Sequence, residues 1–303
     1  MKIYSKKIRK NTTRDVIIEF IAVAFLATGG IWVKLSALSP INTGLYRVLF
    51  SIPLLLPFTC KHLKHLSKKD VAILFFAGIF LAGDVALWNL SFSYTSVANA
   101  NLLTNLTPFT VIPISYFLFK EKMPRFYLLG AVITLIGVFT LLGGKISPDE
   151  SNYFGDFLAF LASFFYAGFL LISYHLRDRI ESSVIMFVSA FGSAVTLFFV
   201  SYFVEGLQTP QSIRQILPLI GLTLCLQVIG HNLLAHCQGK ISINLSSVIC
   251  LTQPAVATVY AFILFHETLS IMEIVGIVIV MAGVYLAKNQ YSPKAGEGDA
   301  ENG

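Results

Sequence analysis

Residues 97–142, VANANLLTNLTPFTVIPISYFLFKEKMPRFYLLGAVITLIGVFTLL, indicate the fold because their skeleton occurs a second time 146 residues later. Both copies are an apolar run interrupted by proline, a short polar hinge with one acid, and a second apolar run with two glycines seven residues apart. The offset carries Pro108, Glu121, Gly130 and Gly137 onto Pro254, Glu267, Gly276 and Gly283 without a gap. The chain is therefore an internal duplication.

The composition predicts an all-α polytopic membrane protein. Of 303 residues, 55% are hydrophobic and 13% are charged, with a mean hydropathy of +0.74, whereas soluble domains average about 25% charged residues. The cysteines are expected to be small buried hydrophobes because they show no CxxC spacing. We expect no disulfide, metal or other cofactor. The net charge of +6 reflects membrane topology, and no nucleic-acid partner is expected.

Ten apolar runs have about the length needed to cross a bilayer. They are predicted at residues 16–33, 40–60, 71–93, 97–119, 126–143, 155–175, 184–204, 216–237, 244–265 and 272–288. Ten spans place both termini on one side. Eighteen Lys and Arg then lie in segments on that side, three lie on the other, and Arg47 lies within a span. This asymmetry favours cytoplasmic termini.

The predicted organisation has five segments. They are a basic cytoplasmic N-terminal tail (1–15), a first repeat (16–143), an outside linker (144–154), a second repeat (155–288) and a disordered cytoplasmic tail (289–303). Five spans per repeat turn the second repeat upside down relative to the first. Inverted repeats of this kind are typical of secondary transporters, whose substrate site lies near the middle of the membrane between the repeats.

The paired patterns TPFTVIPISYFLFKEKM…LLGAVITLIGVFTLL and TQPAVATVYAFILFHETL…EIVGIVIVMAGVYLA resemble the EamA repeat of the drug/metabolite transporter superfamily. LYRVLFSIPLLL, around Arg47, is similar to the family's second helix, although Val48 replaces a common Phe. The resemblance covers residues 16–288. It implies a ten-helix carrier that moves small metabolites by alternating access without ATP. With it we expect an integral protein of the bacterial inner (plasma) membrane.

Asp84 is the strongest candidate for a functional group inside the membrane. An acid at the centre of a span costs about 3 kcal/mol on insertion scales. Asp84, Trp88, Ser91 and Thr95 follow one helical stripe, which predicts that they face a cavity. Substrate or proton handling by Asp84 is one interpretation. Capping by neighbouring hydroxyls or pairing with Arg47 for packing alone is the other.

A second polar stripe lies in the eighth predicted span, at Gln227, His231 and Gln238. His231 is a candidate proton acceptor because histidine titrates near neutral pH. Two other interpretations of His231 are a substrate ligand and a core histidine bonded to a backbone carbonyl. The proton-coupling candidates are thus Asp84 and His231.

Prolines predict breaks in the fourth and ninth spans. Pro108 and Pro254 each remove a backbone donor and free a carbonyl. Polar residues surround both breaks: Asn101, Thr104 and Asn105 in the fourth span, and Ser247, Cys250 and Gln253 in the ninth. We expect these helices to form walls of a pathway, although small polar residues also hold packed helices together.

The remaining charged residues suit positioning or structural roles. Arg47 lies about seven residues inside its span, where its fork suits an acid or a substrate carboxylate. Glu19 is expected at the membrane interface. Glu121 and Glu267 are expected to order the turns that contain them.

These observations predict a secondary transporter for a small polar metabolite, amino acid-like or nucleoside-like or aromatic, acting as exporter or exchanger. The expected partners are this substrate and the lipid bilayer, and the protein is either a monomer or a homodimer. The alternative is an intramembrane lipid- or isoprenoid-processing enzyme. Such an enzyme needs clustered carboxylates, a phosphate loop or an activated nucleophile, and no DDxxD, HExxH or SxxK motif is present.

Overall fold

The computed structural model describes residues 13–63, 66–95, 97–119, 125–143, 153–265 and 268–291. Within these ranges the chain is helical and contains no strand. The helices are α1 (Thr13–Ala27), α2 (Gly29–Leu35), α3 (Pro40–Leu63), α4 (Lys68–Ser91), α5 (Val97–Thr104), α6 (Thr107–Phe119), α7 (Arg125–Gly143), α8 (Tyr153–Leu176), α9 (Ser182–Val204), α10 (Ile213–Leu222), the π-helix η2 (Thr223–Gly230), α11 (His231–Gln238), α12 (Ile243–Cys250), α13 (Gln253–Phe265) and α14 (Ile271–Tyr291).

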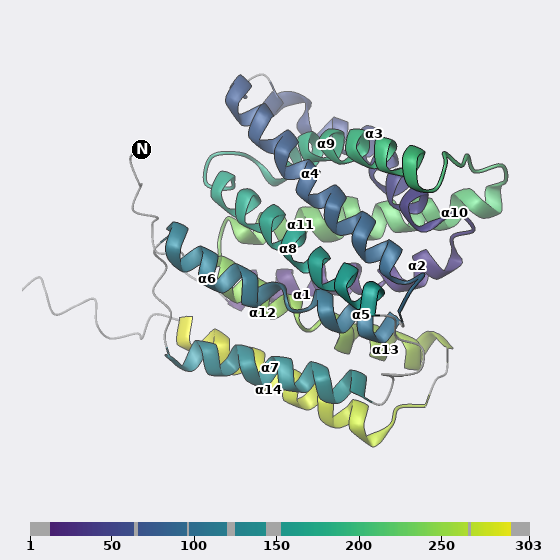
Figure 1. The fold of residues 1–303 in the computed structure, drawn as a ribbon. Coiled ribbons are helices and arrows are strands. Elements are labelled where there is room, and N and C mark those ends of the chain that lie inside the picture. Colours follow the sequence, from purple (N-terminus) through teal and green to yellow (C-terminus); the bar gives the residue numbers. More distant parts are fainter. Residues whose placement is uncertain are drawn as a thin grey trace, which may run out of the picture.

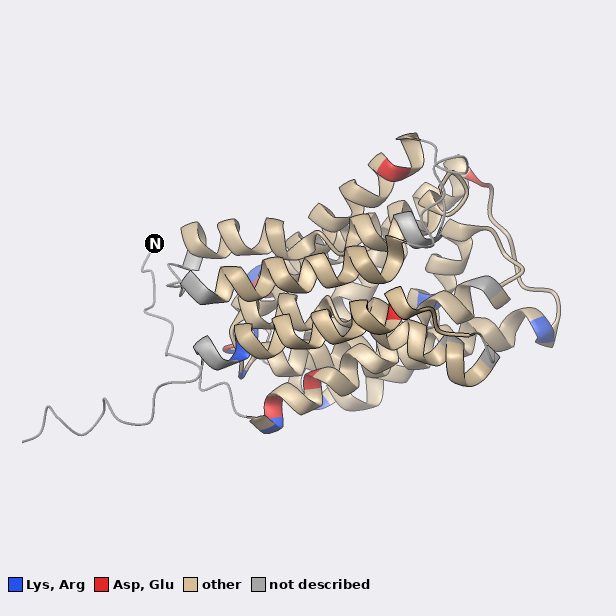
Figure 2. Ribbon diagram, turned by 90° about the horizontal axis from the view of Figure 1, so that it is seen from below, with Lys and Arg blue, Asp and Glu red and all other residues tan. Residues whose placement is uncertain are grey.

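These helices coincide with the ten apolar runs of the sequence (Figure 1). Among the described residues, six spans are single helices and four are interrupted: α1–α2, α5–α6, α10–η2–α11 and α12–α13. Eight helical segments are long and apolar enough to cross a membrane, and residues Tyr127–Gly143 of α7 form a shorter apolar helix. Charged residues are sparse along the helices (Figure 2). The prediction of an all-α polytopic membrane protein is confirmed.

The two ends of the described chain meet at one face of the molecule, which we call the terminal face. The Lys288 ammonium lies 3.4 Å from the Thr13 hydroxyl, and Lys240 forms a 3.6 Å ion pair with Asp15. The opposite face carries the turns after α2 and α9. There Glu205 accepts backbone hydrogen bonds from the first turn of α3.

Helices α7 and α14 are equivalent in the duplication and lie side by side (Figure 1). A Cβ on Gly130 would lie only 2.7 Å from the backbone nitrogen of Ala287. A Cβ on Gly276 would lie 2.6 Å from Leu141. Because the contacting residue numbers fall along α14 as they rise along α7, the two helices run antiparallel. The repeats are therefore inverted, as the odd number of spans predicted.

The segment boundaries differ slightly from the prediction. Helix α1 begins at Thr13 inside the predicted N-terminal tail, α8 begins at Tyr153 inside the predicted linker, and α14 continues to Tyr291. Glu121 and Glu267, whose predicted role was to order turns, lie outside the described residues. The same applies to most of both predicted tails and of the linker.

Candidate functional site

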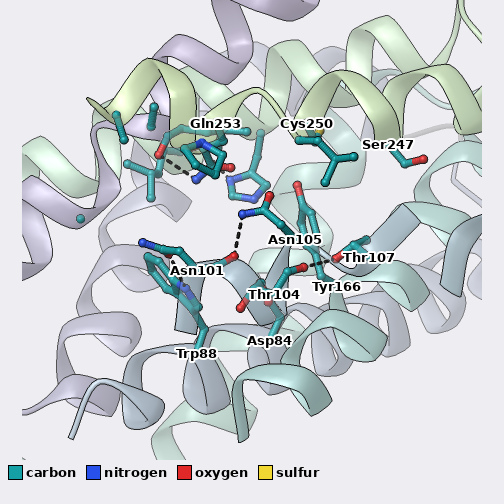
Figure 3. A pocket seen from close by; sticks show the side chains of 18 of the residues that line it. Asp84, Trp88, Asn101, Thr104, Asn105, Thr107, Tyr166, Ser247, Cys250 and Gln253 are labelled. Atoms are coloured by element: carbon teal, nitrogen blue, oxygen red, sulfur yellow. Dashed lines mark hydrogen bonds between the residues drawn. The ribbon is translucent and has the colours of Figure 1, made fainter. Parts of the chain in front are cut away.

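The interrupted spans α1–α2, α5–α6 and α12–α13 surround a cavity of about 130 Å³ together with α3, α4 and α8. Figure 3 shows Ser247, Cys250 and Gln253 along one wall and Asp84 and Trp88 on the other. The fourth interrupted span, α10–η2–α11, completes the lining. The lining residues are Leu26, Ala27, Gly30, Arg47, Asp84, Trp88, Asn101, Thr104, Asn105, Thr107, Pro108, Tyr166, Leu226, His231, Ser247, Cys250, Leu251, Gln253, Pro254 and Ala257.

The break between α5 and α6 exposes polar groups to the cavity. Pro108 has no N–H to donate to the carbonyl of Thr104, and the hydroxyl of Thr107 donates to that carbonyl instead, at 2.8 Å. One turn earlier, the Asn105 amide donates to the Asn101 carbonyl at 2.6 Å. The Asn101 carbonyl also accepts the backbone N–H of Asn105, so of these two carbonyls only that of Thr104 has a side chain in place of its missing helical donor, and this allows the break to persist inside an apolar protein.

The equivalent break between α12 and α13 faces the end of α1. Pro254 cannot donate to the carbonyl of Cys250, which also lines the cavity. The amide of Gln253 lies 3.4 Å from the carbonyl of Leu26, at the last turn of α1. Helix α1 ends at Ala27 and α2 begins at Gly29, so four helix ends, those of α1, α2, α12 and α13, meet at this wall. Helix ends carry unpaired backbone groups that suit a polar ligand.

Arg47 is held by the π-helix η2. Its Nε and Nη2 donate to Oε1 of Gln227 at 3.2 and 3.1 Å, and its backbone carbonyl accepts from Thr223 at 3.1 Å. The guanidinium has five N–H donors. Among the described residues, protein groups engage only those on Nε and Nη2. The side chain is fixed, yet it retains donors for a ligand in the cavity.

Asp84 lies in the same cavity without a direct partner. Its carboxylate forms no hydrogen bond to a described residue and no ion pair with Arg47, although both side chains line the cavity. The nearby Trp88 indole donates to Asn101 at 3.3 Å and so fixes the adjacent wall. An unpaired carboxylate facing a cavity is available to a cation, an ammonium group or a proton.

His231 begins α11, directly after η2. Its Nδ1 donates to the carbonyl of Leu226 at 2.9 Å, a carbonyl that also accepts the backbone N–H of His231 in π-helical geometry. The rings of Tyr166 and Phe169 lie edge-on to the imidazole, with centroids 6.1 and 6.3 Å away. The hydrogen bond required by the core-histidine interpretation is present, and the ring also lines the cavity.

The cavity brings together most residues that the sequence singled out. Among the polar candidates, Ser91, Thr95, Gln227 and Gln238 do not line it. The predicted stripe on α4 therefore faces the cavity only at Asp84 and Trp88, whereas the Ser91 hydroxyl donates to the Trp88 carbonyl and the Thr95 hydroxyl to Asp156. Gln227 instead lies behind Arg47, fully buried, with its Nε2 unpaired among the described side chains. The wall formed by Leu26, Ala27 and Gly30 was not predicted. The Gly29–Gly30 pair inside the first apolar run is the signal that could have located it.

Glu19 corrects one expectation. It is completely buried in α1 rather than interfacial, and it accepts a hydrogen bond from the hydroxyl of Ser246 in α12. Its second oxygen, Oε2, is buried without a hydrogen-bond partner among the described residues. Proximity to the start of a helix is a poor guide to depth, because α12 and α11 cover this part of α1.

The site contains no metal-binding arrangement among the residues that the structure describes. No group of three His, Cys, Asp or Glu side chains in those ranges is placed to hold a metal ion. The chemistry that the cavity offers is hydrogen bonding from amides and hydroxyls, together with one carboxylate and one guanidinium that form no direct ion pair.

Relatives of the chain are named as transporters. It is 27% identical over 258 residues to an uncharacterized transporter of Bacillus subtilis, YetK, with 81% of this chain and 77% of the relative covered. It is 23% identical over 196 residues to a probable amino-acid metabolite efflux pump of Salmonella typhimurium, with 62% of this chain and 66% of that protein covered.

A solved crystal structure has the same fold. It superposes with a TM-score of 0.77 at 16% identity, over 93% of this chain and 98% of the other. The family model described as the EamA-like transporter family matches this chain twice, at residues 14–143 and 153–288. The protein is thus an integral membrane transporter, and the chain belongs to the EamA-like transporter family.

Proposed function

We propose that the protein is a secondary transporter that moves a small zwitterionic, amino acid-like metabolite by alternating access, as an exporter or an exchanger. The main support for this proposal is that Asp84 and Arg47 line the same cavity but form no ion pair with each other. Opposite charges left apart in a low-dielectric site match a ligand that supplies both partners, an ammonium for Asp84 and a carboxylate for Arg47.

The size of the cavity supports a substrate of this class. Because an apolar cavity of about 150 Å³ binds benzene, which has six heavy atoms, the 130 Å³ cavity has room for a compound of about that size, such as a small amino acid. The name of the Salmonella typhimurium relative, a probable amino-acid metabolite efflux pump, points in the same direction. A nucleoside-like or aromatic compound is the competing substrate class, for which Trp88 and Tyr166 offer ring surfaces.

We also infer the orientation in the membrane. The segments that join the spans at the terminal face, together with the two tails, hold eighteen Lys and Arg in the sequence, against three in those of the opposite face. This bias favours a cytoplasmic terminal face in a bacterial inner membrane. Reporter tags on both ends, with accessibility measured in intact cells and inverted vesicles, test it. Labelling of either tag from outside the cell would contradict it.

The substrate proposal is tested by counterflow in proteoliposomes. Purified protein is reconstituted with one unlabelled neutral amino acid inside, and entry of the labelled compound is followed for a panel of amino acids and a panel of nucleosides. We expect counterflow with at least one amino acid. Asp84→Asn and Arg47→Gln should each lower it about tenfold or more, since a hydrogen bond to a charged group contributes about 1.5–3 kcal/mol.

Matched controls separate loss of binding from general damage. Glu181→Gln and Arg214→Gln make the same charge changes at exposed positions and should leave counterflow unchanged. Counterflow with nucleosides alone would overturn the amino acid-like substrate. An Asp84→Asn protein that exchanges as fast as the wild type would overturn the role of the carboxylate.

A further inference from the structure

Glu19 is a buried acid that does not line the cavity, and one of its carboxyl oxygens has no hydrogen-bond partner among the described residues. Its exposed fraction is 0%. The Ser246 hydroxyl donates to Oε1, while Oε2 has no hydrogen-bond partner among the described residues. No Lys, Arg or His in the described ranges forms an ion pair with it. Packing alone does not account for a carboxyl group placed in this way, because a lone charge in an apolar interior is costly.

The position of Glu19 lies between the cavity and the terminal face. Along α1, Asp15 pairs with Lys240 at the terminal face, and Leu26 lines the cavity. Glu19 lies four residues beyond Asp15 and seven before Leu26, or about 6 and 10 Å along the helix axis. Its partner Ser246 directly precedes Ser247, which lines the cavity. Any path from the cavity to the terminal face along α1 and α12 passes Glu19.

That path is closed by a buried polar seam, which we define as Glu19, Ser115, Asn244 and Ser246. The Ser115 hydroxyl of α6 donates to Oδ1 of Asn244 in α12 at 2.6 Å. The Tyr127 hydroxyl of α7 donates to the Asn244 carbonyl at 2.7 Å. All four seam residues are completely buried. The seam thus joins α1, α6 and α12, which are the halves of three interrupted spans that lie between the breaks and the terminal face.

We propose that Glu19 is a proton-binding site of this seam, which acts as the gate on the terminal side of the cavity. With the seam closed, the carboxyl group is retained in its neutral form, because nothing nearby compensates its charge. When α1 and α12 separate, water reaches the carboxyl group and the proton leaves to the terminal face. Binding of a proton therefore favours the closed gate, and its loss favours opening. This inference rests on the alternating access proposed above.

The other titratable groups around Glu19 do not supply the same switch. Cys237 of α11, Cys250 of α12 and Tyr166 of α8 interact electrostatically with Glu19. Tyr260 of α13 donates to the Ala24 carbonyl of α1, and η2, which also packs against α1, contains Cys225. Thiols and phenols ordinarily stay protonated below about pH 8. Asp15 is already paired with Lys240, and Nδ1 of His231 is bonded to a backbone carbonyl.

Cys250 provides a native reporter, because it lines the cavity. Cys60, Cys225 and Cys237 are replaced by serine, and the single-cysteine protein is reconstituted in one orientation. A membrane-impermeant, cationic methanethiosulfonate reagent is added from the terminal face or from the opposite face. The ratio of the two labelling rates is compared at about pH 5.5 and about pH 8, a range below the ordinary titration of most thiols. The ratio cancels the pH dependence of the thiol itself.

We expect the terminal-face fraction of labelling to rise severalfold at the higher pH. Glu19→Gln, which imitates the neutral carboxyl group, should keep this fraction low at both pH values. Glu19→Asp should restore a pH response. The matched control is Asp15→Asn on the same helix, which should preserve the wild-type response. A Glu19→Gln protein with an undiminished pH response would overturn the proposal.

Infrared difference spectra between the two pH values give a second readout that needs no transport. The C=O stretch of a protonated carboxyl group should change with pH in the wild type and in Glu19→Asp. Should Glu19→Gln not fold, a Glu19→Asp spectrum identical to the wild type would overturn the proposal. Labelling of wild-type Cys250 from only one face at every pH would overturn alternating access and the gate together. Labelling from both faces with no effect of Glu19→Gln would overturn the gate alone.

Discussion

Two pairs of helices related by the same duplication differ in how they meet. Helices α7 and α14 are unbroken and touch through glycines, with backbone atoms less than 3 Å from where a Cβ would lie. The spans α5–α6 and α12–α13 are interrupted at their equivalent prolines and line the cavity, and at the first break a side chain bonds the Thr104 carbonyl. The duplication therefore produced one pair suited to rigid contact and one suited to rearrangement.

This difference assigns separate tasks to the two pairs. Close backbone packing gains dispersion contacts without needing polar groups, and it leaves little room for sliding. A proline break concentrates bending at one turn and exposes backbone groups that a ligand or water can satisfy. We expect changes in α7 and α14 to affect folding, and changes at the breaks to affect transport.

The largest effect is expected from filling the glycine contact. Gly130→Leu places a side chain where the backbone atoms of Ala287 and Gly283 lie 2.7 and 2.8 Å from the Cβ position. Overpacking of this kind costs about 3 kcal/mol, and rigid backbone on the other side prevents relief. Thermal unfolding in detergent, followed by size-exclusion chromatography, should show a strongly destabilised or unfolded protein.

Gly143→Leu is the control within the same helix. A Cβ on Gly143 meets nothing within 4 Å, so this variant should unfold like the wild type. Equal stability of the two leucine variants would contradict rigid contact between α7 and α14.

A smaller effect, on transport rather than on stability, is expected from Pro108→Ala. Alanine restores an N–H for the carbonyl of Thr104 and removes the steric conflict of the proline ring, so α5 and α6 can join. The protein should keep its thermal stability or gain some, while the initial rate of counterflow falls about tenfold, or about 1.4 kcal/mol in barrier height.

Pro113→Ala provides the comparison, because Pro113 lies inside α6 and does not line the cavity. It should leave the rate closer to that of the wild type. A larger loss of rate from Pro113→Ala than from Pro108→Ala would contradict a special role for the break.

The sequence predicted those features that leave a local signal. Ten apolar runs, the Lys and Arg asymmetry and the 146-residue offset predicted the inverted fold. Pro108 and Pro254 marked two breaks because proline disrupts a helix wherever it lies in the interior. Asp84 and Arg47 were conspicuous because charges are rare inside membrane spans. Their placement around one cavity agrees with the predicted pathway, while their roles in transport stay predictions.

The features that the sequence did not reveal depend on distant neighbours. Glu19 is buried because α11 and α12 cover it, and its partner Ser246 lies 227 residues away. The π-helix Thr223–Gly230 contains no proline; its carbonyl at Leu226 is bonded by the side chain of His231. The break between α1 and α2 lies at Thr28 and lacks proline as well. Local patterns carry little information about contacts of this kind.

The smallest effect is expected from Thr107→Val. This substitution tests the difference between the broken and the unbroken helices by removing a single hydroxyl. At the break, this hydroxyl donates to the Thr104 carbonyl that Pro108 leaves without a backbone donor. In unbroken α7, the Thr140 hydroxyl also donates to a carbonyl, that of Ile136 at 2.9 Å, but the helix ladder bonds that carbonyl already. Thr107→Val should therefore lower the free energy of unfolding by about 1 kcal/mol, measured in detergent with urea. Thr140→Val should change it by much less, because its carbonyl keeps the backbone partner. If both substitutions cost the same, the hydroxyl of Thr107 does not replace a missing helical bond, and the contrast between broken and unbroken helices would rest on packing alone.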